Sequence, residues 1–188
     1  LSLAEVTALV GQLGRALDEA HDLGLMHLAI RPDRVYLRPG SGIDAVMLGL
    51  MNRPFAAVDR KSCYTSPELY FAKQPDRRAD GWSLAAVAYR CLSGQDAVAE
   101  DQRRLMKWEF ELPSELWLDV PDVEALDRWC ERALHRLPDK RFGTTGLMAR
   151  ALGELGGAGP LAAALGASMP VLAVGSGAPT EERRSTDI

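Results

Sequence analysis

The 188-residue sequence has few cysteines, no excess of positive charge and no stretch with the pattern of a signal peptide. Its three cysteines, Cys63, Cys91 and Cys130, are far apart and form no metal-type pair, which favours reduced thiols in a cytoplasmic protein. The formal net charge of −4 gives no reason to expect nucleic acid or an anionic membrane as a partner. The absence of an initiator methionine is compatible with a segment of a longer protein.

The composition is that of a globular domain followed by a tail of different composition. Hydrophobic residues make up 47% and charged residues 26%, and the length suffices for one domain with its own core. From Gly156 onward the sequence is rich in Gly, Ala and Pro. Residues 155–180 carry no charge, but Pro160 and Pro170 interrupt them, so a flexible linker or peripheral helix is favoured over a transmembrane helix. We therefore expect a domain over 1–155 and a linker or tail over 156–188.

The stretch from Asp80 to Gly94 is apolar or small on every face. Arg90 is its one formal charge between Trp82 and Leu92. A surface helix would show a polar side, so this pattern predicts a helix buried on most sides. Asp80 is expected to cap its first turn, and Gly94 to end it in the left-handed conformation.

The remaining pattern is mainly helical. A Ser2–Glu5 capping box predicts a helix that runs to Gly24, and residues 35–37 and 45–48 read as two short strands of a hairpin. Residues 52–63 lack periodicity and predict a surface loop. Further helices are expected to open at Ser66-Pro67, to span about 101–110, to start at Pro121 and to span about 144–155.

Several segments resemble, in the same order, the C-terminal lobe of the protein kinase fold. The family's catalytic loop reads H-R-D-L-K-P-x-N, where this chain has HLAIRPDR from His27 to Arg34. The other segments are Tyr64 to Glu68, similar to the end of the activation segment, Asp80 to Gly94, similar to the central buried helix, and Ala133 to Phe142, similar to the late helix pair. The resemblance covers roughly residues 2–153. It implies a mainly α lobe of an α+β family, with one small β-hairpin and the N-terminal lobe absent from the sequence.

The resemblance also implies that the chemistry of the family is missing. Phosphoryl transfer needs a carboxylate to accept the hydroxyl proton, and an Asp and an Asn to hold magnesium. Ala29 stands at the position of the catalytic Asp, Arg34 at that of the magnesium-binding Asn, and Leu48 where the metal-binding Asp is expected. Arg31 replaces the catalytic-loop Lys, and Lys61 the Thr that usually contacts the catalytic Asp. No glycine-rich loop followed by a strand lysine occurs, so we expect no catalytic residue, no metal and no cofactor.

The other polar residues of the sequence are no clear substitute for the missing catalytic and metal-binding residues. Asp33 is the one acid in the loop, but in the family's spacing it falls on a variable position. Asp44, just before the second strand, is expected to be a turn residue. His21 and His135 are expected to be surface or helix-end residues.

The residues that hold such a lobe together are retained. By resemblance, His27 is a core histidine packed below the loop, and Asp80 bonds to the backbone of that loop. Glu68 and Arg141 match the family's buried ion pair. The sequence thus keeps structural positions and loses those that turn over ATP.

These observations predict a catalytically inactive kinase-like domain, a pseudokinase, that works as a protein-binding or regulatory module. The expected partner is a protein, either an N-terminal lobe or another kinase. The loop over 52–63 and the region 95–118 would form the interaction surface, with Trp108, Phe110 and Trp117 as candidate contacts. An alternative is that these aromatic residues fold back onto the core.

Two further functions stay open at this point. One is an active serine/threonine kinase with unusual catalytic residues, of which this sequence is the C-terminal lobe. The other is a nucleotide sensor that binds ATP without hydrolysis, with Arg34 pairing directly with a phosphate.

Overall fold

The computed structural model describes residues 1–38, 42–47, 59, 62–98, 110–116, 118 and 120–155. The expected helix over 101–110, most of the expected loop over 52–63 and the tail over 156–188 lie outside the described residues. The described elements follow one another as α1, η1, β1, β2, α2, α3, η3, α5, η4 and α6.

Helix α1 (Leu3–Asp22) begins at the predicted capping box. The Ser2 hydroxyl accepts a hydrogen bond from the backbone N–H of Glu5, and the Glu5 carboxylate accepts one from the backbone N–H of Ser2. These two bonds satisfy N–H groups that a helix start leaves without partners. The apolar residues on one side of this helix are buried: Val6, Leu9, Val10, Leu13 and Leu17. After the helix, Gly24 turns the chain with φ of 75°.

Helix α3 (Arg78–Ser93) is the buried helix that the sequence predicts: Ala79 and Asp80 are buried, and so is every residue from Trp82 to Tyr89. Its end is as predicted, because Gly94 adopts the left-handed conformation with φ of 74°. Its start is not. The helix begins at Arg78, ahead of Asp80, so Asp80 lies inside the first turn and does not cap it. The carboxylate is instead used outside the helix, as described below.

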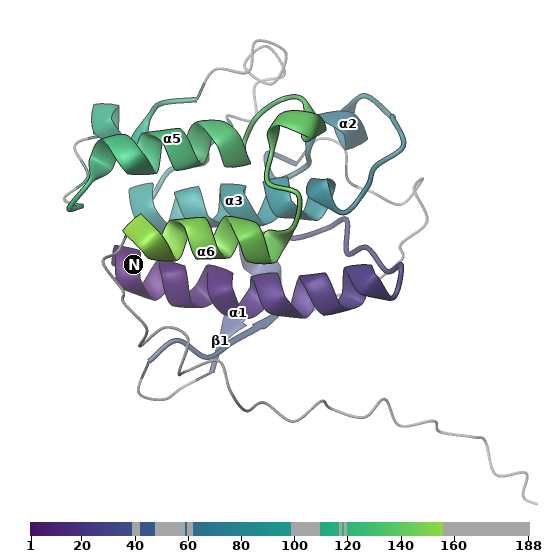
Figure 1. The fold of residues 1–188 in the computed structure, drawn as a ribbon, viewed down its shortest axis with the longest axis horizontal. Coiled ribbons are helices and arrows are strands. Elements are labelled where there is room, and N and C mark those ends of the chain that lie inside the picture. The colour runs from purple at the N-terminus through teal and green to yellow at the C-terminus, as the bar shows by residue number, and fades with distance from the viewer. Residues whose placement is uncertain are drawn as a thin grey trace, which may run out of the picture.

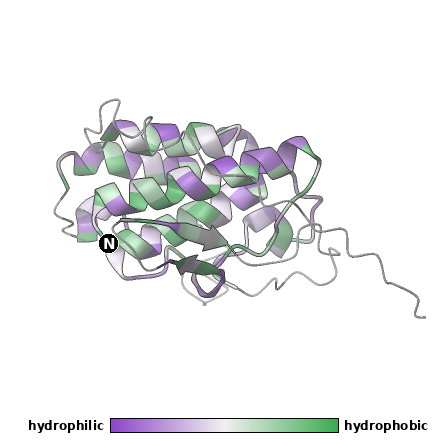
Figure 2. Cartoon of the chain, turned by 90° about the horizontal axis from the view of Figure 1, so that it is seen from below, coloured by the Kyte–Doolittle hydropathy of each residue, from purple (hydrophilic) through white to green (hydrophobic). Residues whose placement is uncertain are grey.

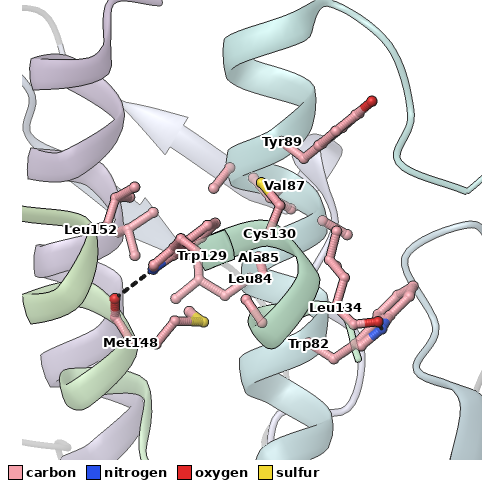
Figure 3. Close-up of a cluster of buried hydrophobic side chains, with 14 of the residues drawn as sticks. Trp82, Leu84, Ala85, Val87, Tyr89, Trp129, Cys130, Leu134, Met148 and Leu152 are labelled. Carbon is pink, nitrogen blue, oxygen red and sulfur yellow. Dashed lines mark hydrogen bonds between the residues drawn. The ribbon is translucent and has the colours of Figure 1, made fainter. Parts of the chain in front are cut away.

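Helices α5 (Val123–Ala133) and α6 (Thr145–Leu155) complete the helical layers. Pro121 was expected to start α5, but the helix begins at Val123, and Asp122 caps it by accepting from the N–H of Ala125 at 2.9 Å. The indole N–H of Trp129 donates to the carbonyl of Met148 at 2.9 Å, so α5 and α6 are joined within the core (Figure 3). Of the short 3-10 turns, η1 (Pro32–Arg34) lies between α1 and β1, η3 (Pro113–Leu116) precedes α5, and η4 (Pro138–Lys140) connects α5 to α6.

The hairpin consists of β1 (Val35–Leu37) and β2 (Ala45–Met47), antiparallel, with Val35 opposite Met47. It is attached to α1 through Gln12. The side-chain amide of Gln12 donates to the carbonyl of Ile43 at 2.6 Å, and its oxygen accepts from the N–H of Ala45 at 2.8 Å. Viewed from the hairpin side, the strands carry mainly hydrophobic residues and lie across the helices (Figure 2).

The helices α1, α3, α5 and α6 lie alongside one another, with the hairpin on the outer side of α1 (Figure 1). Helix α2 (Pro67–Tyr70) lies at the end of this stack, beside the turn between α5 and α6 (Figure 1). The predicted fold class is confirmed: the described chain is mainly α with one small hairpin. Among the described residues, no helix is long and apolar enough to cross a membrane.

Candidate functional site

The loop over residues 27–34, called here the anchored loop, is held from below by helix α3. The carboxylate of Asp80 is fully buried and accepts hydrogen bonds from the backbone N–H groups of His27 at 2.8 Å and Leu28 at 2.7 Å. Leu28 has φ of 54°, a left-handed conformation that is unfavourable for a bulky side chain. The two charge-assisted bonds offset this strain, so α3 determines the shape of the loop.

His21 joins the same cluster, which sequence reasoning missed. Its Nε2 lies 2.9 Å from Oδ2 of Asp80, and its Nδ1 lies 4.0 Å from a carboxylate oxygen of Asp18. Of the two positions expected for His21, surface or helix end, the structure shows the helix end, because His21 lies in the last turn of α1 and its side chain is only 1% exposed. The signal was present in the helical spacing, because His21 follows Leu13 and Leu17 at intervals of one turn, on the buried face.

His27 is 1% exposed and lies beneath the loop, in the position that the sequence predicts for a core histidine. Leu28, next to it, packs with Leu69 of α2 and Ala79 of α3 in a small apolar cluster. The start of the anchored loop is therefore tied to the core by both polar and apolar contacts.

The outward part of the loop is dominated by arginine. Arg31 forms a bidentate contact with Asp33, with nitrogen–oxygen distances of 2.9 and 2.7 Å, and lies 3.4 Å from Asp59. The hydrogen bond from Arg31 holds the pKa of Asp33 below its ordinary value. Asp33 is therefore an ionised acceptor already engaged by a guanidinium group, which makes it a poor general base.

Ala29 and Arg34 occupy the positions where the family resemblance expects an acid and a metal ligand. Ala29 contributes only a methyl group. Arg34 donates its backbone N–H to the carbonyl of Arg31 at 3.0 Å, and among the described residues its guanidinium group makes no hydrogen bond or ion pair. Leu48 and Lys61 lie outside the described residues.

A hollow of about 280 Å³, open solvent included, lies over this loop. The described residues that line it are Leu28, Ala29, Ile30, Arg31, Arg34, Asp59, Ser62, Tyr64 and Thr65. Most of this volume is open solvent, so the hollow is a shallow depression and not an enclosed ligand pocket. Within the described ranges, no group of three or more His, Cys, Asp or Glu side chains is placed to hold a metal ion.

Glu68 and Arg141, predicted to pair, form a bidentate contact with distances of 2.8 and 2.7 Å. Both side chains are buried, and Arg141 also donates to the carbonyls of His135, Arg78 and Arg136. The pair thus joins α2 to the turn η4. Removing one partner of a buried pair typically costs about 3–5 kcal/mol, because the other charge stays buried.

Of the three aromatic residues predicted to contact a partner protein, the structure describes only Phe110. Trp108 and Trp117 lie outside the described residues. Phe110 is half-buried, packs against the core and meets the Tyr89 ring edge to face, with ring centroids 6.1 Å apart. For Phe110, the contacts are those of the alternative in which the ring folds back onto the core.

Comparison with known proteins finds serine/threonine-protein kinases both among sequences and among solved structures. The serine/threonine-protein kinase PknI of Mycobacterium tuberculosis is 32% identical over 161 residues, which are 84% of this chain and 25% of PknI. PknF of the same species is 29% identical over 170 residues, which are 82% of this chain and 36% of PknF. A crystal structure of the M. tuberculosis PknI kinase domain matches with a TM-score of 0.67 and 30% identity, covering 84% of this chain and 57% of that domain. No family model matches the sequence.

The chain spans between about a quarter and a little over a third of the curated relatives named above. The chain likewise matches only a little over half of the solved kinase domain.

Proposed function

The chain belongs to the protein kinase superfamily, and on that premise we propose that it is a catalytically inactive kinase-like lobe that acts by binding another protein. The observation that carries the proposal is the contrast within the anchored loop. Its inner contacts, from Asp80 to the N–H groups of His27 and Leu28, are complete, whereas its outer positions hold Ala29 and Arg34.

The chemistry of phosphoryl transfer supports this proposal. The reaction needs a carboxylate that orients the attacking hydroxyl group, and acidic or amide oxygens that hold magnesium against the phosphates. The methyl group of Ala29 cannot accept a proton, and the guanidinium group of Arg34 cannot ligate a cation. Asp33, the nearest acid in sequence, is engaged by Arg31 at 2.7 Å.

A protein partner is part of the proposal, either an N-terminal kinase lobe or another kinase. A cytoplasmic location is also proposed. It is supported by the absence of a disulfide among Cys63, Cys91 and Cys130, because disulfides are rare in that compartment.

One observation favours a second function, metal-free nucleotide binding. Arg34 lines the hollow over the loop, and its guanidinium group makes no ion pair with the described residues. Such a group can pair with a phosphate directly. In this second function the protein would sense ATP without transferring its phosphate.

The test is thermal melting of the longest native form of the protein with and without ATP, each with and without magnesium. A ligand at 100 times its dissociation constant adds about 2.7 kcal/mol of stability, which is a visible rise in melting temperature. We expect no rise in any condition and no phosphate transfer to a generic serine/threonine substrate.

Each other result identifies a different function. A rise without magnesium that disappears in Arg34→Ala would favour the nucleotide sensor. A rise that requires magnesium, together with phosphate transfer abolished by Asp33→Ala, would establish an active kinase and overturn the proposal.

A further inference from the structure

A basic face lies at the end of the molecule opposite the N-terminus, where α2, the start of α3 and the turn η4 meet (Figure 1). It is formed by residues 68–78 and 131–141. Lys and Arg outnumber Asp and Glu in these two segments, although the whole chain has a net charge of −4. The basic residues are Lys73, Arg77, Arg78, Arg132, Arg136, Lys140 and Arg141, and the acidic ones are Glu68, Asp76, Glu131 and Asp139.

The acids of this face are largely engaged within it. Glu68 pairs with Arg141 in the buried contact, while Asp76 and Asp139 each lie 2.6 Å from Arg78. The hydrogen bond from Arg78 holds the pKa of Asp76 below its ordinary value, so this acid is ionised and already neutralised. Among the described residues, Arg77 and Arg132 form no ion pair, so their charge is available to a partner.

Apolar groups accompany the cations. Phe71 is 38% exposed and Leu137 is 55% exposed. The guanidinium carbon of Arg136 lies 5.7 Å from the centroid of the Phe71 ring, so a cation and an aromatic face are presented together. A surface that combines arginine with exposed aromatic and aliphatic groups has the composition of a protein-binding site.

Beside these groups is a hollow of about 230 Å³, open solvent included. Arg77, Arg78 and Arg141 lie at its basic side, and its apolar lining includes Trp82, Ala133, Phe142 and Met148. Arg132 lies over the Phe142 ring, 4.2 Å from its centroid. Most of this volume is open solvent, and Arg78 and Arg141 are already paired, so the hollow is a shallow depression beside the docking groups and not itself the docking site.

We propose that this basic face docks an acidic segment of a partner protein, with carboxylates on Arg77 and Arg132 and an apolar side chain near Phe71 and Leu137. This inference rests on the proposed function, since it names the chemistry of the bound protein. A protein segment is preferred to a lipid surface because arginine predominates over lysine, and its planar group pairs with two oxygens of a carboxylate.

The experiment measures fluorescence anisotropy of a labelled peptide in which glutamates flank a phenylalanine and a leucine, titrated with the full native protein. A second peptide carries glutamine in place of every glutamate. We expect binding of the acidic peptide only, weakening as salt is added. Arg77→Glu should weaken it by roughly tenfold, since it replaces an attraction by a repulsion.

Two matched controls separate this face from general electrostatics. Arg15→Glu makes the same charge change at an exposed position of α1 and should leave the affinity within about twofold, because distant exposed charges are screened. Leu137→Ser should weaken binding, whereas Leu147→Ser, at a side chain with the same 55% exposure on α6, should not. Thermal melting of each variant verifies that it is folded.

The proposal is overturned if the acidic peptide does not bind, or if the Arg77 and Arg15 variants weaken binding equally. It is also overturned if phosphatidylserine vesicles bind through this face while the peptide does not, which would indicate a membrane surface. These results leave the catalytic question untouched, because phosphate transfer is measured separately. Failure of the docking face is therefore distinguishable from failure of the proposed function.

Discussion

The buried carboxylate of Asp80 connects three parts of the structure. It is fully buried in the first turn of α3, yet both of its oxygens are used outside that helix. Oδ1 accepts from the N–H of Leu28, and Oδ2 accepts from the N–H of His27 and lies 2.9 Å from the His21 ring. A single side chain therefore joins the end of α1, the anchored loop and α3.

We expect Asp80→Ala to lower the free energy of unfolding by roughly 2–6 kcal/mol, because it leaves the N–H groups of His27 and Leu28 buried without an acceptor. Asp80→Asn retains one acceptor oxygen and should cost less. Urea unfolding measures both values. Asp139→Ala is a suitable control, since that side chain is 87% exposed. Equal losses in the Ala and Asn variants would show that packing, and not hydrogen bonding, explains the effect.

At the scale of elements, α1 and α6 are fastened together by Asp18. Its carboxylate accepts from the N–H groups of Thr145 at 3.0 Å and Gly146 at 2.8 Å, so a residue of α1 caps the start of α6. The two helices also approach closely, because the Thr145 hydroxyl donates to the carbonyl of Gly14 at 2.8 Å. A Cβ atom at Gly14 would lie only 3.1 Å from the carbonyl oxygen of Thr145.

Two glycines of α6 provide a matched test of this fastening. Gly→Ala within a helix normally stabilises by about 0.5–1 kcal/mol. We expect that gain for Gly153→Ala, whose new Cβ would lie 3.7 Å from the Thr7 methyl group. For Gly146→Ala the new Cβ would lie 2.6 Å from Oδ2 of Asp18, so the carboxylate must move and the variant should be destabilised. Thermal melting decides, and an equal gain in both variants would show that the Asp18 cap contributes little.

The sequence predicts these elements better than it predicts how they are joined. The capping box, the hairpin, the buried helix and the helix near 144–155 follow from local patterns, and the structure contains them. The starts of α3 and α5 differ, because Asp80 serves a distant loop and Asp122 replaces Pro121 as the relevant signal. The Asp18 cap joins residues 127 positions apart, and no local pattern reports such a contact.

At the scale of the whole molecule, the three cysteine thiols differ in how far packing shields them from solvent. Cys130 is completely buried and Cys63 is 7% exposed, while Cys91 is half-buried at the outer part of α3. Burial raises the pKa of the thiols of Cys91 and Cys130, so both are less nucleophilic than an exposed cysteine.

We expect a thiol reagent at pH 8 to modify native Cys91 slowly and Cys130 only after unfolding in urea. Mass spectrometry of the modified peptides distinguishes the sites, and the unfolded protein, in which all three thiols react, is the reference. Modification of Cys130 as fast as Cys91 in the native state would mean that the core between α3 and α5 opens readily.

The support of the anchored loop from α3 has an evolutionary consequence. Because Asp80 and the apolar contacts of Leu28 hold the loop from inside, the residues on its outer side are under little structural constraint. An ancestral lineage could replace them one at a time while the backbone path stayed the same. The same independence makes the loop a convenient platform for protein engineering, where new recognition residues could be introduced at Ala29 and Arg34 without redesigning the core.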